Sequence, residues 1–246
     1  MNAPGAEPLS AARAAQVCDA VLAWSGARQW RGWNKHDGLN SPLLRALLGW
    51  GKWPRILAIQ AVMRAPVNLR PLLRVPRTYN PKGLALFAQA CLDRYRAGGD
   101  ARHLATATAL LDLLGRLASP GPWSGSCWGY QYPWQDPGFH APAATPNAVV
   151  SAFVCEAFLD AFEVTGRADY LDTVTRALPF FLRDLTVLKD EPDELCLAYM
   201  PLPMRMRVLD VSILVASVLA RHARASGAST HAATARRLAC YVVRRQ

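Results

Sequence analysis

Two aspartates in aromatic-rich loops are the residues best suited to do chemistry in this sequence. Asp37 lies in the loop WRGWNKHDGLNSP, and Asp136 lies in a longer loop over residues 123–147. A glycosidase or a polysaccharide lyase needs a proton donor and a second carboxylate or base, which flank the bond that breaks. The pair therefore predicts a catalytic site for glycan cleavage. In the alternative interpretation Asp37 caps its own turn through its side chain and Asp136 is solvated.

The longer loop carries aromatic side chains that suit a carbohydrate. They alternate with Gly, Pro and polar residues and follow neither a helical nor a strand period. Aromatic faces stack on sugar rings, and polar groups fix their orientation. The predicted ligand-binding residues are His36, Asn40, Trp128, Tyr130, Gln131, Trp134, Gln135, His140 and Asn147, with Trp128, Tyr130 and Trp134 as the stacking platform. Alternatively, the aromatic residues close one end of a helical core.

The other titratable residues give no sign of a metal or cofactor. The sequence contains no HxH, HExxH or CxxC spacing, and its six cysteines are widely scattered. P-loop and dinucleotide-binding fingerprints are absent as well. Glu156 and Asp160 share one helix face, where they are expected to flank an apolar stripe. We therefore expect neither a bound metal nor a cofactor.

The positive charge is unevenly placed along the 246 residues, which carry a formal net charge of +10. Between Asp37 and Asp93 no acidic residue occurs, whereas eight Lys or Arg residues fall there. This favours an anionic partner such as an acidic glycan, a nucleotide-sugar or a phospholipid surface. Trp50 and Trp53 lie among these cations. This composition suits an alternative function, in which the protein is a non-catalytic module that binds an anionic lipid surface or takes part in an assembly. Nucleic acid is not favoured, because the arginines form no recognised motif.

The sequence also predicts where in the cell the protein is located. No apolar run reaches the ~18 residues of a membrane span, and the first residues lack the basic start and apolar core of a secretory signal. We expect a cytoplasmic protein that is peripheral to the inner membrane if it binds lipid. Residues 1–8 are predicted to be a disordered tail, and residues 9–246 a single domain.

Periodic apolar residues and capping signals predict an all-α fold. The turns RAGGDARHL, VTGRADYL and ASGASTHA recur at intervals of sixty to seventy residues. Such a repeat of helical hairpins is typical of a solenoid or a closed toroid. Strands are not expected. The predicted helices span residues 11–24, 42–48, 54–65, 80–96, 100–118, 145–164, 169–185, 208–225 and 230–245.

Three groups of motifs stand together along the chain: DGLNSPL, VNLRPLL with NPKGLALF, and CWGYQYPWQ with TPN. In this order they resemble a group of bacterial proteins found with extracellular-polysaccharide biosynthesis. The fold of that group is similar to the α/α-toroid of the six-hairpin glycosidases. The likeness spans about Trp30 to Gln246. It implies a ring of inner and outer helices, with DGLNS and CWGYQYPWQ at its mouth, and a carbohydrate-binding or carbohydrate-modifying role.

The sequence departs from that group at four positions. Asn34 and Pro133 stand where acidic residues are usual, and Asp210 and Ser212 stand where the group has asparagine. Its members also continue beyond the position of Gln246, so the resemblance implies an incomplete toroid. We expect an uncovered flank, closed by a homodimer, by a partner protein or by the helix over residues 11–24. The residues predicted to line that flank are Ile213, Leu214, Val218, Leu238 and Val242.

Overall fold

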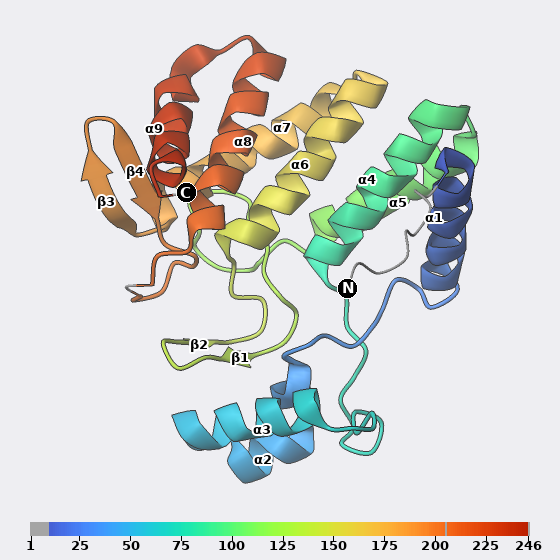
Figure 1. Ribbon diagram of the computed structural model, residues 1–246, viewed down its shortest axis with the longest axis vertical. Helices are drawn as coiled ribbons and strands as arrows, with labels where there is room; N and C mark the ends of the chain where they lie inside the picture. Colours follow the sequence, from blue (N-terminus) through green and yellow to red (C-terminus); the bar gives the residue numbers. More distant parts are fainter. Residues whose placement is uncertain (1–9, 205, 246) are drawn as a thin grey trace, which may run out of the picture.

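The computed structural model describes residues 10–204 and 206–245, so the predicted tail over residues 1–8 lies outside them. The fold class is all-α, as predicted, and each helix begins within three residues of its predicted start (Figure 1). No helix of the described ranges is long and apolar enough to cross a bilayer. The helices are α1 Ala11–Gly26, α2 Pro42–Leu48, α3 Lys52–Arg64, α4 Pro81–Gly98, α5 Ala101–Arg116, α6 Ala148–Thr165, α7 Ala168–Pro179, α8 Leu209–Ser226 and α9 Ala232–Val243, with the short helical turns η1 Asp37–Asn40, η2 Phe180–Asp184 and η3 Ser229–His231.

The helices from α4 to α9 form three α/α-hairpins that stand side by side, the arrangement of an α/α-toroid. The pairs are α4 with α5, α6 with α7, and α8 with α9, and the first helix of each pair contacts the first helix of the next (Figure 1). Gly99, Gly166 and Gly227 end these first helices with φ near +70°. Glycine adopts this left-handed conformation without strain, which explains the repeated turn in the sequence. We call these three hairpins the helical arc.

Helix α6 is the centre of the helical arc because it contacts α4, α7 and α8. Eleven of its residues are buried, more than in any other helix of the described chain. A helix that is apolar around most of its circumference suits this position. The loops that begin and end at α6 are therefore anchored on the most buried helix of the described chain.

The first helices of the three hairpins all begin at one end of the helical arc. Asn80 caps α4 by accepting a hydrogen bond from the amide N of Gly83 (3.3 Å), and Asn147 caps α6 by accepting one from Val150 (2.8 Å). Figure 1 shows that these ends face the loop over residues 117–147 and the region of α2 and α3. This end corresponds to the mouth that the resemblance implied.

A small lobe lies opposite this mouth and consists of η1, α2 and α3 (Figure 1). Its buried cluster is Leu39, Ala58 and Ile59, with Leu44 and Leu48 packed against it. The chain enters the small lobe and leaves it along the same path, since residues 32 and 78 pair as an antiparallel bridge. The small lobe is thus held by a thin core and by its two connecting segments.

The expectation of no strands is wrong for two short antiparallel hairpins. The strands of the first hairpin have two residues each, too few for a period-2 pattern, and one strand of the second hairpin is buried at every position, so it shows no alternation. The second hairpin packs against α9 and α8, where β4 is fully buried. The strands are β1 Trp134–Gln135 paired with β2 His140–Ala141, and β3 Val187–Glu191 paired with β4 Glu194–Leu197.

The flank beyond α8 and α9 differs from the predicted one. Val218, Leu238 and Val242 are buried, so the prediction that they line an open flank is wrong, and Leu214 is half-buried. Ile213 is 39% exposed and lies in a shallow groove between α8 and α9 that is lined mostly by alanines. Helix α1 packs against α4 at the opposite end of the helical arc, so it does not close a ring (Figure 1).

Candidate functional site

The loop between α5 and α6 is clamped at its base by the two motifs CWGY and TPN. The amide N of Asn147 donates to the carbonyl O of Trp128 (3.0 Å), and the amide N of Trp128 donates to Oγ of Ser151 (2.9 Å). A Cβ on Gly129 would lie 1.9 Å from the carbonyl O of Thr145, so only glycine fits there. The motifs therefore have a structural reason for their residues and their spacing.

Trp128 is part of the core and does not fit the predicted stacking platform. Its side chain is 1% exposed, its Nε1 donates to the carbonyl O of Leu114 (2.7 Å), and its ring packs near that of Phe158. No face of the indole is free for a sugar. For this residue the alternative interpretation, an aromatic plug at the end of a helical core, describes the structure.

Around Trp134, aromatic rings gather at the mouth of the helical arc. We call Tyr130, Tyr132, Trp134, Phe139 and Tyr199 the aromatic cluster. Tyr130 stacks on Tyr132 at a centroid distance of 5.4 Å, and Trp134 meets Phe139 (4.9 Å) and Tyr199 (6.2 Å) edge to face. Burial raises the pKa of Tyr132 and of Tyr199, so both hydroxyls stay protonated. Tyr130 and Trp134 are half-buried and keep part of their surface accessible.

No sequence pattern indicates that Tyr199 belongs to this cluster. It follows β4, far along the chain from the other members, and is fixed because its carbonyl O accepts a hydrogen bond from the amide N of Ala148 (2.9 Å). The tight pairing of the β3–β4 hairpin ends just before it. A pattern of residues along the chain carries no signal for such a long-range contact.

His36 joins the small lobe to the aromatic cluster. Its ring stacks on Trp134 with centroids 5.4 Å apart and an angle of 21° between the planes. Burial lowers the pKa of His36, as does the charge of Lys35, while Asp136 and Asp37 oppose this. The imidazole is therefore neutral at pH 7, with one nitrogen that donates and one that accepts hydrogen bonds.

Asp37 is committed to the internal structure of the small lobe. It is 1% exposed, its Oδ1 accepts from Nε of Arg70 (2.8 Å), and its Oδ2 accepts from the amide N of Asn34 (2.7 Å). Arg70 donates a further bond to the carbonyl O of Asn34 (2.9 Å). This geometry does not fit a proton donor that faces a substrate. It also differs from the expected cap of the turn that Asp37 begins, because the carboxylate accepts from Arg70 and from the preceding Asn34 instead.

The β1–β2 hairpin presents the remaining predicted residues in two ways. Gln135 is buried, and its amide Nε2 donates to the carbonyl oxygens of Asp136 (2.8 Å) and Phe139 (2.7 Å), so it holds the hairpin. Asp136 is half-buried and accepts from the amide N of Gly138 (3.2 Å). His140 is exposed as a whole residue, but partial burial of its imidazole lowers its pKa, as does the charge of Arg55. Of these three residues on the β1–β2 hairpin, Asp136 and His140 have side-chain polar atoms that a ligand can reach.

Several buried polar atoms near the mouth lack a hydrogen-bond partner among the described residues. They include Nδ2 of Asn40, Nδ2 of Asn147 and Oγ of Ser212. Asn147 and Ser212 lie at the first turns of the adjacent helices α6 and α8 and are completely buried. Gln131, in contrast, is half-buried and donates weakly to the carbonyl O of Gly129 (3.3 Å). Unpaired buried groups are costly, so these atoms call for water or a ligand.

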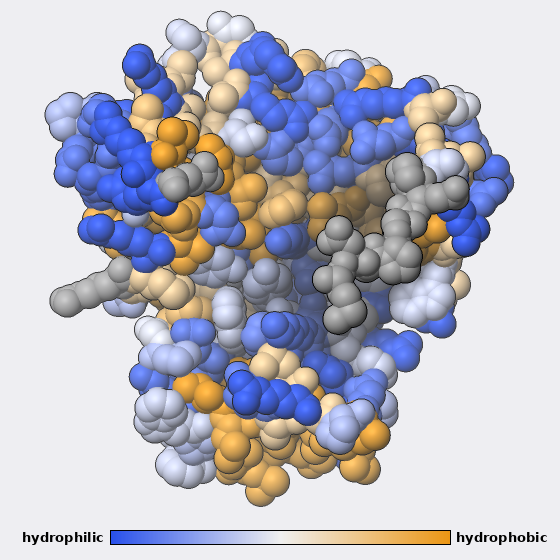
Figure 2. Space-filling view, in the orientation of Figure 1, coloured by the Kyte–Doolittle hydropathy of each residue, from blue (hydrophilic) through white to orange (hydrophobic). Residues whose placement is uncertain are grey.

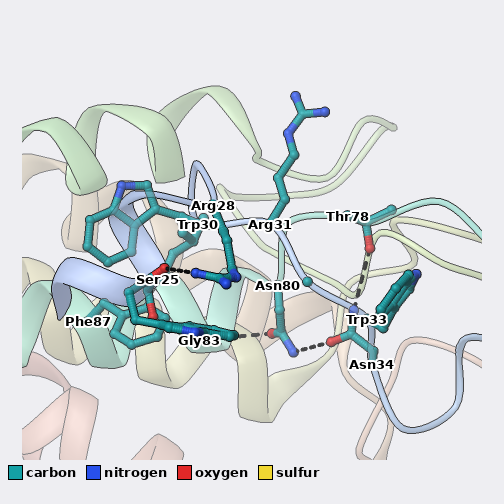
Figure 3. A pocket seen from close by; sticks show the side chains of 13 residues that line it. Ser25, Arg28, Trp30, Arg31, Trp33, Asn34, Thr78, Asn80, Gly83 and Phe87 are labelled. Carbon is teal, nitrogen blue, oxygen red and sulfur yellow. Dashed lines mark hydrogen bonds between the residues drawn. The ribbon is translucent and has the colours of Figure 1, made fainter. Parts of the chain in front are cut away.

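A cavity of about 230 Å³ opens between α1, the segment over residues 30–34 and the first turns of α4. Figure 3 shows a chain of polar groups along it: Asn80 Nδ2 donates to Asn34 Oδ1 (2.7 Å), and Asn34 Nδ2 donates to Thr78 Oγ1 (3.4 Å). Sequence reasoning missed this cavity as a site. Its lining residues are Trp24, Ser25, Arg28, Trp30, Arg31, Gly32, Trp33, Asn34, Thr78, Asn80, Gly83, Leu84 and Phe87.

The walls of this cavity are aromatic and carry nearby cations. The rings of Trp30 and Phe87 lie 5.2 Å apart by their centroids, and Trp33 donates through Nε1 to the carbonyl O of Val75 (2.9 Å). Arg28 and Arg31 also line the cavity, and neither forms an ion pair within the described chain. The WRGW signal was visible in the sequence, but its partners on α1 and α4 were not.

One segment, residues 30–37, connects the cavity to the aromatic cluster. Its first half lines the cavity, and its second half carries His36, which stacks on Trp134. The groups that these two parts expose are aromatic faces, amides, hydroxyls and cations. Such groups recognise a ligand through stacking and hydrogen bonds, and they supply little acid–base chemistry.

Comparison with models of known families finds no match, and comparison with curated proteins finds none either. Among solved structures, the chain is similar to a GH76 alpha-mannanase from Bacteroides thetaiotaomicron, which was solved as a selenomethionine derivative. The sequence identity is 16% and the TM-score is 0.49. The similarity covers 67% of this chain and 46% of the mannanase, so it spans less than half of that enzyme.

Proposed function

We propose that this protein binds an oligosaccharide or polysaccharide at the mouth of the helical arc. The observation that carries the proposal is the cavity whose lining combines tryptophan rings with a chain of amide and hydroxyl groups from Asn80, Asn34 and Thr78. A sugar ring offers C–H groups to an aromatic face and hydroxyls to amides, so both kinds of wall are used. A volume of about 230 Å³ suits one sugar unit of a longer chain. Neighbouring units would extend toward Trp134 and Tyr130.

The charge near the cavity favours an acidic glycan. Arg28 and Arg31 line the cavity without a carboxylate partner in the described ranges, and the whole chain carries a net charge of +10. Guanidinium groups bind carboxylates and phosphates through charge-assisted hydrogen bonds. A uronic-acid unit or a phosphate-bearing sugar fits this arrangement. A role in bacterial polysaccharide production agrees with the resemblance of the sequence motifs.

The proposal is binding without cleavage of the glycan. Both oxygens of Asp37 accept hydrogen bonds from Arg70 and Asn34, so of the predicted catalytic pair only Asp136 is accessible. A glycosidase needs two carboxylates placed about the bond. Incubation with the bound glycan should therefore release no reducing ends, and steady release that depends on Asp136 would overturn this part of the proposal.

Calorimetric titration with a panel of uronic-acid and neutral oligosaccharides tests the binding. Trp33→Ala removes one aromatic wall and should weaken binding by ~1–3 kcal/mol, the range for an aromatic hot spot. Thr78→Val removes only a hydroxyl from the polar chain and should weaken it less. Trp53→Ala is the matched control, since Trp53 is 69% exposed and lies outside the cavity. Equal affinity of all three variants and the wild type, or no binding to any glycan, would overturn the proposal.

A further inference from the structure

The outer face of α2 and α3 is apolar and uncovered. Leu47 is 70% exposed, Trp50 78%, Trp53 69% and Leu57 62%. Figure 2 shows hydrophobic residues gathered over the end of the molecule where Figure 1 places these two helices. We call this surface the α2–α3 face. Isolated exposed apolar residues are common, but a continuous group of this kind marks an interaction surface.

The α2–α3 face is not needed to fold the small lobe. Leu44 and Leu48 on α2, together with Ala58 and Ile59 on α3, already pack on the buried cluster around η1. Leu47 lies next to Leu44 along α2, at the i+3 position, yet it is 70% exposed, and no residue of that helix is buried. The apolar surface of each helix is thus wider than the part that packs against the buried cluster.

Cations without a carboxylate partner lie on α2 and α3 and on the segment that follows them. Arg45, Lys52, Arg64 and Arg74 are exposed, and none of them forms an ion pair within the described parts of the chain. Among the eight basic residues between Asp37 and Asp93, Arg70 is the one that pairs with a carboxylate there. The exposed apolar side chains are therefore accompanied by charges of a single sign, which we call the Lys and Arg rim.

We propose that the α2–α3 face docks on an anionic lipid bilayer. Leucine side chains would enter the boundary of the acyl chains, the two tryptophans would lie at the level of the headgroups, and the Lys and Arg rim would contact anionic headgroups. The corner Gly49–Trp50–Gly51–Lys52–Trp53 between the helices projects both tryptophans and one cation together. This inference goes beyond glycan binding and rests on a separate surface.

The charge pattern favours a bilayer over a protein partner. The acid-free sequence around the face gives a partner no carboxylate to pair with, so the complementary surface must be uniformly anionic. A bilayer of anionic lipid has such a surface, together with an apolar interior beneath it. The helical arc and the mouth stand on the other side of the small lobe, so docking leaves both accessible (Figure 1).

Vesicle flotation tests the proposal. The whole chain should bind vesicles of phosphatidylglycerol mixed with phosphatidylcholine, and it should bind vesicles of phosphatidylcholine alone much less. Added salt should weaken the binding, since charges are screened over ~8 Å at physiological ionic strength. The double variant W50A/W53A should lower the partition coefficient by at least ~10-fold, because burying even one large apolar side chain is worth about that factor.

Two controls keep the result specific. The side chain of Val243 on α9 is 67% exposed, similar to that of Leu47 on α2. Leu47→Ser should reduce vesicle binding, whereas Val243→Ser should leave vesicle binding unchanged. Thr78→Val should also leave it unchanged, which separates this proposal from glycan binding. Absence of vesicle binding, equal binding to both vesicle types, or wild-type binding by W50A/W53A with an unchanged thermal melt would each overturn the proposal. A protein partner would give the first of these results.

Discussion

The helical arc and the small lobe use apolar residues in different ways. In the helical arc, α6 lies between α4 and α8, and residues such as Val154, Cys155 and Ala157 have no exposed surface. In the small lobe, the buried cluster consists of Leu39, Ala58 and Ile59, while larger side chains such as Trp50 remain outside. The helical arc therefore stabilises itself through its core. The small lobe depends on its connections and exposes a surface whose apolar residues contribute little to folding.

The two regions meet at a few well-defined contacts. Trp134 packs against the cluster of the small lobe and against His36, and Arg55 approaches Oε1 of Gln135 (3.5 Å). The ion pair of Asp37 and Arg70 lies just beside this junction and ties η1 of the small lobe to the segment that follows α3. Variants in the helical arc should thus change global stability, and variants at Asp37 should loosen the small lobe alone.

The largest effect is expected for Trp128→Ala in the helical arc. The change removes a ring that is 1% exposed together with its hydrogen bond to Leu114, so the free energy of unfolding should fall by ~3–5 kcal/mol. Denaturant unfolding followed by circular dichroism measures it. A loss below ~1 kcal/mol would mean that Trp128 is not a core residue and would reopen its predicted role as a stacking surface.

A somewhat smaller effect is expected for Asp37→Ala. Breaking a buried ion pair costs ~3–5 kcal/mol, and the lower end applies because the side chain of Arg70 is 16% exposed. Hydrogen exchange should become faster in α2 and α3 and stay unchanged in α6. A double-mutant cycle with Arg70→Ala isolates the pair. Uniformly faster exchange in all helices would contradict the independence of the small lobe.

An effect confined to acid pH is expected at the end of the helical arc. The ammonium of Lys189 and the guanidinium groups of Arg244 and Arg245 lower the pKa of Glu194 from 4.5 to about 2. The ionised carboxylate thus stabilises the contact of the β3–β4 hairpin with α9 above pH 4.5, and this stabilisation is lost as the pH falls through about 2. Thermal melts of the wild type should show this loss, and Glu194→Gln should show less of it. If the melting temperatures of the wild type and Glu194→Gln depended on pH in the same way, the stabilising role of the Glu194 carboxylate would be contradicted.

The smallest effect on stability is expected for Trp50→Ala in the small lobe. Because this side chain is 78% exposed, its removal should change the free energy of unfolding by less than ~0.5 kcal/mol. Unfolding under the conditions used for Trp128→Ala gives a direct comparison of two tryptophans in one chain. A cost above ~2 kcal/mol would show that Trp50 packs internally, and the α2–α3 face would then not be free.

The sequence predicted the helical arc well because its signals are local. Asn80 and Asn147 are helix caps that precede apolar periods, and Gly99, Gly166 and Gly227 end the helices in a left-handed conformation. Each of these signals acts within one or two turns of helix. The strands β1 and β2 were missed because they have two residues each, and β4 because all of its residues are buried and show no alternation.

The candidate site could be predicted only in part, because it is assembled from distant segments. Trp134 and Tyr130 lie at the mouth as expected, whereas the side chain of Trp128, two residues before Tyr130, is buried in the core. The same types of residue occur at both depths, so composition alone cannot separate a stacking surface from a plug. The cavity joins residues 24–34 to residues 78–87, and no pattern along the chain indicates that contact.

Glycan binding at the cavity is tested most directly by the indole N–H resonances of the eight tryptophans during titration with an acidic oligosaccharide. Single tryptophan variants assign the resonances. The signals of Trp30 and Trp33, which line the cavity, should shift with a common dissociation constant, while those of the buried Trp128 and the exposed Trp50 should stay in place. Saturable binding that leaves Trp30 and Trp33 unshifted would contradict the assignment of the cavity as the glycan site.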